Sequence, residues 1–379
     1  MKAVARGHEF FGRATSGTQP PGSGGTSTLS AGRIESVRIG LVNNMPDSAV
    51  ERTQRHFIDL LQSSADGLRV EVMLYSLPAI PRAAAAREHI ASTYEPIDAL
   101  WDDGLAAIVV TGTEPSERNL KDEVFWGSLA GLIDAIDASG IPAMFSCLAA
   151  HAAVLQVDGV PRSALADKCF GVFEDDVAVE HKLMEGVGAR MWLPHTRWNE
   201  VSEAELVKAG YQILSRSDAA GVSFFAKERR GLWLLCQGHP EYDGANLLRE
   251  YRRDVSRFLS RKRATYPELP RSYFGEPEAQ LLCAFKDAAV AQGDATFMQA
   301  FPRILPGSPT WDAWRVGATS VFGNWLKYVS AAKASRDAAR SDFKPDPVNT
   351  DVAGYIGDQY LTGRAVEPAS APSGDGWRL

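Results

Sequence analysis

Cys147 of this 379-residue chain lies in a sequence context that is typical of a catalytic nucleophile. Cys147 directly follows the apolar run IPAMFS (141–146), which predicts a buried strand, and the small residues Ala149 and Ala150 come soon after it. This pattern suits a tight turn from a strand into a helix, which lifts the side chain above the sheet and turns backbone N–H groups toward a developing oxyanion. The helix N-terminus would also favour the thiolate, the form that attacks. The alternative for such a cysteine is a small buried hydrophobe.

A second segment supplies a base and a carboxylate. The sequence GHPEYD (238–243) follows an apolar run and places His239 and Glu241 two residues apart. In an extended segment, residues i and i+2 point the same way, so the carboxylate can orient the imidazole ring. For His239 alone, a turn histidine with satisfied hydrogen bonds is the alternative. Together with Cys147, the two residues predict a catalytic triad of nucleophile, base and orienting acid.

Strands that alternate with helices predict an α/β fold, with a mostly parallel sheet flanked by helices. Apolar runs that predict strands lie at 37–42, 69–77, 106–112 and 141–146, with helical spacing at 48–63 and 123–139. Ligands of such sheets bind beyond the carboxyl ends of the strands. Three polar loops fall at such ends: NNMPD (43–47), TGTEPSE (111–117) and SCLAAH (146–151). We therefore expect the chemistry at this edge of the sheet.

The rest of the chain predicts a sheet extension and a helical C-terminal part. Short β-like runs occupy about 169–237, an amphipathic helix covers 245–259, and a Trp-rich helix covers 311–336. We expect a flexible N-terminal tail, a catalytic domain, a C-terminal helical extension with an insertion at about 276–310, and a loose C-terminal tail. Their bounds are 1–35, 36–262, 263–336 and 337–379.

Composition argues against several classes of protein. A net charge of −7, a pI near 5.6 and the lack of a Lys/Arg-rich run argue against nucleic-acid binding. No stretch has the roughly 18 to 20 apolar residues of a membrane span, and the N-terminus lacks the pattern of a secretory signal. The four cysteines show no CxxC spacing, so no zinc site or redox dithiol is indicated. We expect a cytoplasmic protein without a metal.

The order of several motifs resembles that of the homoserine O-succinyltransferase (homoserine O-acyltransferase) family. The resemblance covers about residues 36–262 and resumes at 311–328, and GHPEYD together with EYRRDV makes it specific. The motifs are VTG (110–112), Trp126, FSCLAAHAA, KCFGVF, LPHTRW, GHPEYD, EYRRDV, WDAWR and NWLKY. The resemblance implies a class I glutamine amidotransferase-like, flavodoxin-like fold.

The resemblance also implies a reaction. Cys147 would take the acyl group from succinyl-CoA or acetyl-CoA and pass it to the hydroxyl of homoserine or a related hydroxy-amino acid, in methionine biosynthesis. His239 would be the base and Glu241 its orienting partner. The acyl-CoA would be a co-substrate, with no permanently bound cofactor, and small molecules would be the partners of a possible homodimer. The backbone N–H groups expected at the oxyanion belong to Leu148, Gly112 and Thr113.

Four further residues match substrate-contacting positions of that family. Arg253 would hold the α-carboxylate of the amino acid, a task that suits the bidentate guanidinium group. Lys168 and Thr196 match a lysine and a hydroxyl residue that contact the substrate. Ser116 falls near the position associated with the choice between succinyl and acetyl. Without the family, Arg253 would be a solvated helix charge, and Lys168 and Thr196 ordinary surface residues.

The sequence departs from the family near the site. Asp47 stands where the family usually carries lysine, and Ser116 is neither of the residues expected at its position. The Ser116 hydroxyl could hydrogen-bond a succinyl carboxylate, whereas uncompensated charge on Asp47 and Glu117 would disfavour a dianionic acyl group. The resemblance and Ser116 together favour succinyl over acetyl.

Two alternatives to acyl transfer remain on the same scaffold. A glutamine amidase or hydrolase would use the same triad, but such enzymes usually have glycine two residues either side of the nucleophile, where this chain has Phe145 and Ala149. A binding protein that kept the fold would be expected to lack a triad member. The acceptor could be homoserine, serine or another hydroxy-amino acid.

Overall fold

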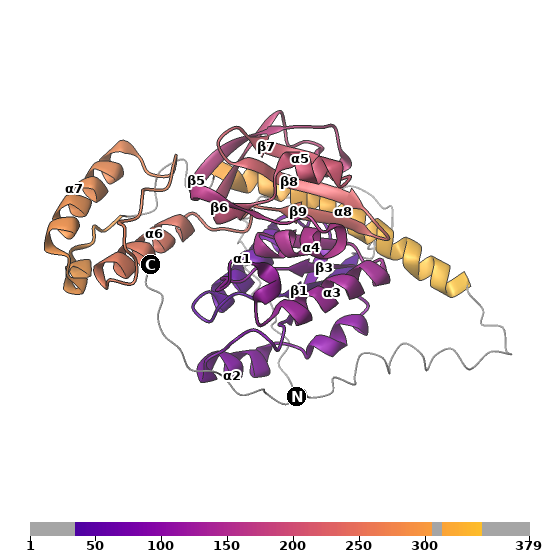
Figure 1. The fold of residues 1–379 in the computed structure, drawn as a ribbon. Helices are drawn as coiled ribbons and strands as arrows, with labels where there is room; N and C mark the ends of the chain where they lie inside the picture. Colours follow the sequence, from indigo (N-terminus) through magenta and orange to yellow (C-terminus); the bar gives the residue numbers. More distant parts are fainter. Residues whose placement is uncertain (1–34, 305–312, 343–379) are drawn as a thin grey trace, which may run out of the picture. The chain divides into compact units, whose positions relative to one another are not determined.

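The computed structural model describes residues 35–304 and 313–342, and nine strands of these residues form one sheet (Figure 1). The order across the sheet is β2-β1-β3-β4-β9-β8-β7-β5-β6. The strands are β1 (Ser36–Val42), β2 (Arg69–Tyr75), β3 (Ala107–Val110), β4 (Ala143–Ser146), β5 (Ser163–Val177), β6 (Arg190–Glu200), β7 (Gln212–Ser217), β8 (Gly221–Glu228) and β9 (Leu232–Cys236).

Helices connect and cover these strands. The α-helices are α1 (Val50–Ser63), α2 (Ala84–Thr93), α3 (Trp126–Ser139), α4 (Leu148–Asp158), α5 (Glu203–Lys208), α6 (Asn246–Leu259), α7 (Glu276–Gln292) and α8 (Ala313–Asp342). Short 3₁₀ turns occur at η1 (Ile97–Trp101), η2 (Leu120–Asp122), η3 (Lys182–Met184) and η4 (Ala295–Ala300).

The sheet has a parallel part and an antiparallel part. Strands β2, β1, β3, β4 and β9 pair in parallel, and β8, β7, β5 and β6 continue the sheet with antiparallel pairings. Every residue of β3, β4 and β9 is buried, as expected for parallel strands that are covered on both faces. The predicted α/β fold is confirmed, and the β-like runs after residue 169 form the expected extension.

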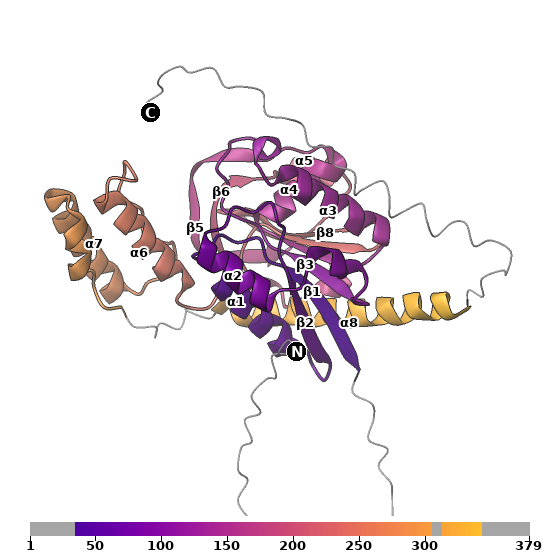
Figure 2. The same cartoon turned by 90° about the horizontal axis from the view of Figure 1, so that it is seen from below.

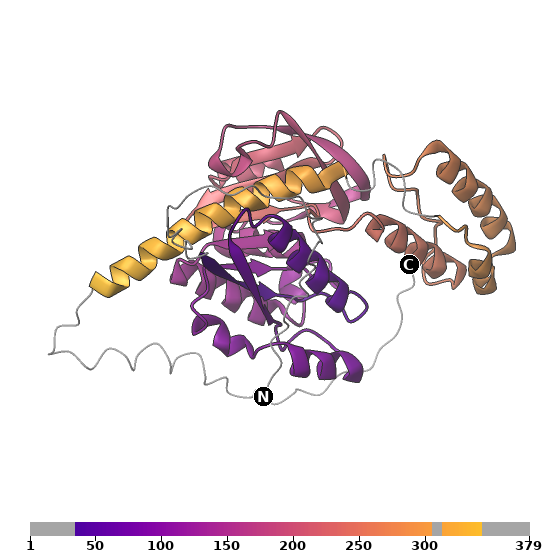
Figure 3. The ribbon, with the colours of Figure 1, turned by 180° about the vertical axis from the view of Figure 1, so that it is seen from behind.

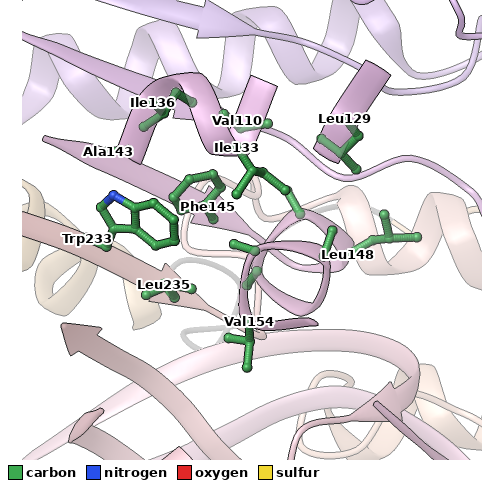
Figure 4. Packing of buried hydrophobic residues seen from close by; sticks show 14 of the residues in the cluster. Val110, Leu129, Ile133, Ile136, Ala143, Phe145, Leu148, Val154, Trp233 and Leu235 are labelled. Atoms are coloured by element: carbon green, nitrogen blue, oxygen red, sulfur yellow. The ribbon is translucent and has the colours of Figure 1, made fainter. Parts of the chain in front are cut away.

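Each face of the sheet packs on its own set of helices. Successive residues of a strand point to opposite faces, so Val110 packs with Ile133 of α3 (Figure 4), whereas Val109 joins the cluster of Phe57 in α1 and Trp325 in α8. Figure 2 shows α3 and α4 on one side of the sheet and α8 on the other. In Figure 3, the view from behind, α8 lies in front of the sheet.

The C-terminal helices differ from the predicted boundaries. Helix α8 begins at Ala313 and runs to Asp342, so the boundary predicted at residue 337 falls inside it. This helix is part of the core, because it packs on β6, η3 and α1, and Trp325 is buried in the same cluster as residues of β1 and β3. The predicted insertion contains α7 and η4, and Phe285 of α7 and Phe301, directly after η4, pack with Tyr251 of α6 in a third cluster. Residues 1–34 of the predicted tail (1–35) and the residues after 342 lie outside the described part.

Candidate active site

Cys147 lies at the turn between β4 and α4. Its φ angle of 53° and ψ angle of −115° place a non-glycine residue in the left-handed region, which costs free energy and is found most often at functional sites. The backbone N–H of Cys147 donates to the carbonyl of Cys236 at 2.7 Å, so the turn is fixed to the end of β9. The side chain is partly exposed, whereas the residues of α4 that follow are buried. The Cys147 side chain is therefore partly accessible, while the backbone that carries it is held in place by its hydrogen bond to β9 and by the buried first turns of α4.

His239 and Glu241 follow the end of β9, beside this turn. The imidazole Nδ1 donates to Glu241 Oε1 at 2.8 Å, and the two side chains are only 8% and 4% exposed. The backbone N–H of His239 donates to the carbonyl of Pro194 at 2.8 Å, and the Tyr242 ring stacks on the imidazole with 4.3 Å between the ring centroids. These contacts fix the plane of the ring and leave Nε2 available to the thiol of Cys147.

The charges of the three residues depend on one another. Burial alone would lower the pKa of His239, but the carboxylate of Glu241, the Cys147 sulfur and hydrogen bonds to both raise the pKa well above its usual value. A protonated imidazole is thus stabilised between the carboxylate and the sulfur. Because a neighbouring positive charge favours a cysteine thiolate, the arrangement is that of an activated nucleophile.

The loop after β3 comes close to the first turn of α4. A Cβ atom on Gly112 would lie 3.0 Å from the backbone nitrogen of Leu148, so a side chain at this position would press directly on the turn. The N–H of Leu148 opens α4 and therefore has no acceptor within the helix. Thr111 Oγ1 accepts from the N–H of Asn44 at 2.9 Å and donates to the carbonyl of Gly112 at 3.0 Å. Leu148, Gly112 and Thr113 all line the cavity described next.

A cavity of about 570 Å³ opens over Cys147, His239 and Glu241. Its acidic lining residues are Glu114, Glu241, Glu250 and Asp254. Its basic lining residues are Arg52, Arg162, Lys168, Arg197, Arg249, Arg253, Arg257, Lys262 and Arg263. The excess of basic groups suits anionic ligands, even though the whole chain has a net charge of −7.

Glu250 of α6 links the predicted substrate residues to the triad. Its carboxylate accepts hydrogen bonds from Thr196 Oγ1 at 2.6 Å and from the Tyr242 hydroxyl at 2.7 Å. Lys168 Nζ lies 3.9 Å from the same carboxylate, and Tyr242 stacks on His239. Thr196 and Lys168 therefore share one hydrogen-bonded and ionic network with the ring that stacks on His239.

Asp254, one turn further along α6, holds two basic side chains at the cavity. Its oxygens accept from Lys168 Nζ at 2.9 Å and from Arg253 Nε and Nη2 at 3.2 Å. Burial alone would raise the pKa of Asp254, but Lys168 and Arg253 lower it below its usual value. The side chain of Arg253 is 45% exposed, so its guanidinium group is accessible to a ligand as well as to Asp254.

Two residues that the sequence analysis connected with the acyl group do not line the cavity. The Ser116 hydroxyl donates to Glu123 at 2.9 Å, and Ser116 is absent from the cavity lining. The structure therefore gives no support for a contact between Ser116 and the acyl group. Asp47 accepts from the N–H of Ala83 at 2.7 Å and lies 3.4 Å from Arg82, so its charge is compensated outside the cavity. The expected repulsion between Asp47 and a dianionic acyl group is thus removed by Arg82.

Other residues of the site were not predicted from the sequence. Tyr242 and Glu250 lie inside motifs that carried the resemblance, so the motifs contained a signal, but only the structure gives their contacts. Trp314 of α8 is fully buried, and its Nε1 donates to the carbonyl of Tyr242 at 3.0 Å. It holds the segment of His239 and Glu241 from a helix more than seventy residues further along the chain. Arg162, directly before β5, also lines the cavity.

In the part of the chain that the structure describes, no group of three or more His, Cys, Asp or Glu side chains is placed to hold a metal ion. None of the described helices is long and apolar enough to cross a membrane.

Comparison with known proteins gives consistent matches along most of the chain. A family model described as homoserine O-succinyltransferase matches residues 26–336. The homoserine O-succinyltransferase of Methylorubrum extorquens (strain DM4) is 44% identical over 294 residues, which are 78% of this chain and 87% of the relative. That of Bradyrhizobium japonicum is 41% identical over 293 residues, 77% of this chain and 90% of the relative.

Among solved structures, a glutamine amidotransferase from Methylobacillus flagellatus is similar at 13% identity, over 78% of this chain and 95% of that chain, with a TM-score of 0.43. A glutamine amidotransferase from Thermotoga maritima is similar at 12% identity, over 68% and 97% of the two chains, with a TM-score of 0.40. Similarity at this level carries no information about activity.

Proposed function

The chain belongs to the homoserine O-succinyltransferase family, and from that membership we propose that it transfers a succinyl group from succinyl-CoA to the hydroxyl of homoserine, through a thioester on Cys147. It is an O-acyltransferase of methionine biosynthesis. The observation that carries the proposal is that Cys147, His239 and Glu241 meet at a cavity in which basic side chains outnumber acidic ones.

The first half-reaction loads the enzyme. The Cys147 thiolate attacks the thioester carbonyl of succinyl-CoA while His239 carries the proton that the thiol has lost. The backbone N–H groups of Leu148 and of the Gly112 loop stabilise the negative oxygen of the tetrahedral intermediate. Collapse of that intermediate breaks the bond to the CoA sulfur, which takes the proton from His239, and leaves a succinyl thioester on Cys147.

The second half-reaction transfers the acyl group. His239 takes the proton from the homoserine hydroxyl, and the oxygen attacks the thioester carbonyl on Cys147. A second tetrahedral intermediate forms in the same oxyanion site and expels the Cys147 thiolate. The O-succinyl ester leaves, and the proton stays on His239, so the thiolate–imidazolium pair is restored.

The network on α6 fits a zwitterionic acceptor. Arg253 presents a guanidinium group that can bind the α-carboxylate in a bidentate manner. Lys168 stands on the other side of Asp254, and Glu250 supplies a negative charge for the α-ammonium group. Thr196 can contact the rest of the amino acid, since its hydroxyl lies on Glu250 at the cavity wall. The glutamine amidase alternative is not favoured, because the relatives are acyltransferases.

The proposal is tested by identifying the product. Purified protein is mixed with succinyl-CoA or acetyl-CoA and with homoserine or serine, and the products are analysed by mass spectrometry. We expect O-succinylhomoserine as the main product when all four substrates compete. Formation of free succinate at the rate of CoA release, without any ester, would instead indicate a hydrolase.

Replacing Arg253 by alanine is expected to weaken acceptor binding selectively. A charge-assisted hydrogen bond is worth about 1.5–3 kcal/mol, so the KM for homoserine should rise about 10- to 100-fold. The rate at which succinyl-CoA acylates Cys147 should stay near the wild-type value, because that step does not involve the acceptor. Stopped-flow acylation and steady-state kinetics measure the two effects separately.

The neighbouring Arg252 offers a matched control. Its guanidinium group lies over the Phe301 ring, 5.5 Å from the centroid, and it does not line the cavity. Arg252→Ala removes the same charge from the same helix and should leave the KM for homoserine unchanged. Equal KM values for wild type and Arg253→Ala would return Arg253 to the role of a solvated helix charge.

A further inference from the structure

The acyl group proposed for Cys147 ends in a second carboxylate, and the cavity must supply a group that binds it. Most basic residues of the lining already have a carboxylate within 4.0 Å. They are Lys168, Arg197, Arg249, Arg253, Arg257 and Arg263. Among the residues that the structure describes, no carboxylate lies this close to Arg52, Arg162 or Lys262. These three are the candidates for an anionic ligand.

Arg162 differs from the other two in having an unsatisfied buried donor. Its Nη2 donates to the carbonyls of Glu117 and Arg118, both at 3.2 Å, which holds the guanidinium group against the loop after β3. Its Nε is buried without a hydrogen-bond partner among the described residues. A buried donor that finds no acceptor destabilises the folded chain, so such a group is expected to meet a ligand.

Arg162 and Cys147 line the same cavity. Burial lowers the pKa of the Arg162 guanidinium group, an effect that the charges of Glu123 and Cys147 oppose. A succinyl group on Cys147 carries its carboxylate at the end of a short chain. Its binding partner must therefore be close to the sulfur.

The residue expected to bind this carboxylate from the sequence, Ser116, is not available. Glu123, itself 4% exposed, accepts from the Ser116 hydroxyl at 2.9 Å, from the Ser116 N–H at 2.8 Å and from the Glu117 N–H at 2.7 Å. These three bonds anchor the loop after β3 independently of Arg162. The loop is therefore expected to keep its place when the guanidinium group is removed.

We propose that Arg162 binds the distal carboxylate of the acyl group on Cys147 and thereby selects succinyl-CoA over donors with a neutral acyl chain. This inference rests on the proposed function and names a specificity residue of the same site. A guanidinium group can bind a carboxylate through two parallel N–H groups, and the bond is strongest where water is excluded.

The test compares two donors that differ at a single group. Butyryl-CoA has the same carbon chain as succinyl-CoA, with a methyl group where succinyl has the carboxylate. In Arg162→Gln, the rate constant for acylation of Cys147 by succinyl-CoA at low donor concentration should fall about 10- to 100-fold, as expected for the loss of a charge-assisted bond. Acylation by butyryl-CoA should stay close to the wild-type rate.

Arg230→Gln is the matched control, because Arg230 is exposed, donates to the carbonyl of Ala138 and does not line the cavity. It should leave both donors unaffected. If Arg162→Gln does not fold, Arg162→Lys keeps the charge without the planar fork. It should lower the ratio of succinyl to butyryl acylation by a smaller factor than expected for glutamine.

Three results would overturn the assignment of Arg162 by itself. Equal losses with both donors would show that Arg162 only supports the loop, and unchanged succinyl acylation would show that another group binds the carboxylate. A wild-type enzyme that is acylated equally well by both donors would also contradict the assignment while leaving the proposed thioester chemistry intact. If no CoA ester acylates the wild type, the proposed function itself fails, and this inference fails with it.

Discussion

Turnover by Cys147→Ala is expected to fall by about four to six orders of magnitude, which is the loss seen when the nucleophile of a triad enzyme is removed. The reason is that the acyl group is bonded to the Cys147 sulfur in both half-reactions. A weaker general base cannot compensate for the loss of this nucleophile. Steady-state release of CoA in the presence of homoserine measures the effect. Alanine should preserve the fold, because the Cys147 side chain is partly exposed and the turn is held by its backbone bond to Cys236.

A second cysteine provides the control for this variant. Cys283 is exposed on α7 and lies outside the cavity, so Cys283→Ala should keep wild-type turnover. Thermal unfolding of both variants shows whether the fold is kept. Turnover in a folded Cys147→Ala protein within about tenfold of wild type would mean that the acyl group moves directly from CoA to the acceptor.

Replacing Glu241 by glutamine is expected to lower the rate of acylation by about two to four orders of magnitude, by analogy with the loss of the orienting acid in other triads. Glutamine has nearly the same shape, but it carries no charge, and when its amide NH₂ group faces His239 Nδ1 it forces that nitrogen to accept. The proton would then sit on Nε2, which could no longer take the proton of the thiol. The loss of the carboxylate also removes a main cause of the raised His239 pKa.

The shorter acid distinguishes charge from position. Glu241→Asp keeps the negative charge but moves it away from Nδ1, so its rate should lie between those of wild type and Glu241→Gln. Acylation is followed by the burst of CoA released on mixing enzyme with donor. If Glu241→Gln acylates as fast as wild type while both proteins unfold at the same temperature, Glu241 has no part in the chemistry.

Most strands of the parallel sheet could be located from the sequence, but the way in which the strands and helices pack together could not. Runs such as 106–112 and 141–146 are apolar throughout, and this property results from burial on both faces, so β3 and β4 could be located from composition. The place of β9 beside β4 could not be predicted, because the pairing joins segments separated by the whole antiparallel extension. Helix α8 extends past its predicted end, since helix boundaries depend on local packing as well as on periodicity.

The residues of the site also divide into those with a short-range sequence pattern and those that only tertiary contacts reveal. Cys147, His239 and Glu241 could be predicted because a nucleophile turn and an extended His-x-Glu segment have short-range patterns. Ser116 was placed from its position in the sequence alone, and its contact with Glu123 shows why position does not give side-chain direction. Arg162 has no local pattern at all. Its proposed role rests on a buried donor and on the cavity that it shares with Cys147, which only the folded chain brings together.

The central claim is that the acyl group rests on Cys147 between the two half-reactions. The most direct measurement is the intact mass of the protein after mixing with succinyl-CoA in the absence of homoserine, followed by peptide mapping. The account predicts a single succinyl adduct on the peptide that contains Cys147, absent from Cys147→Ala and lost within one turnover when homoserine is added. An adduct that persists in Cys147→Ala, or one on the wild type that homoserine does not discharge, would contradict it.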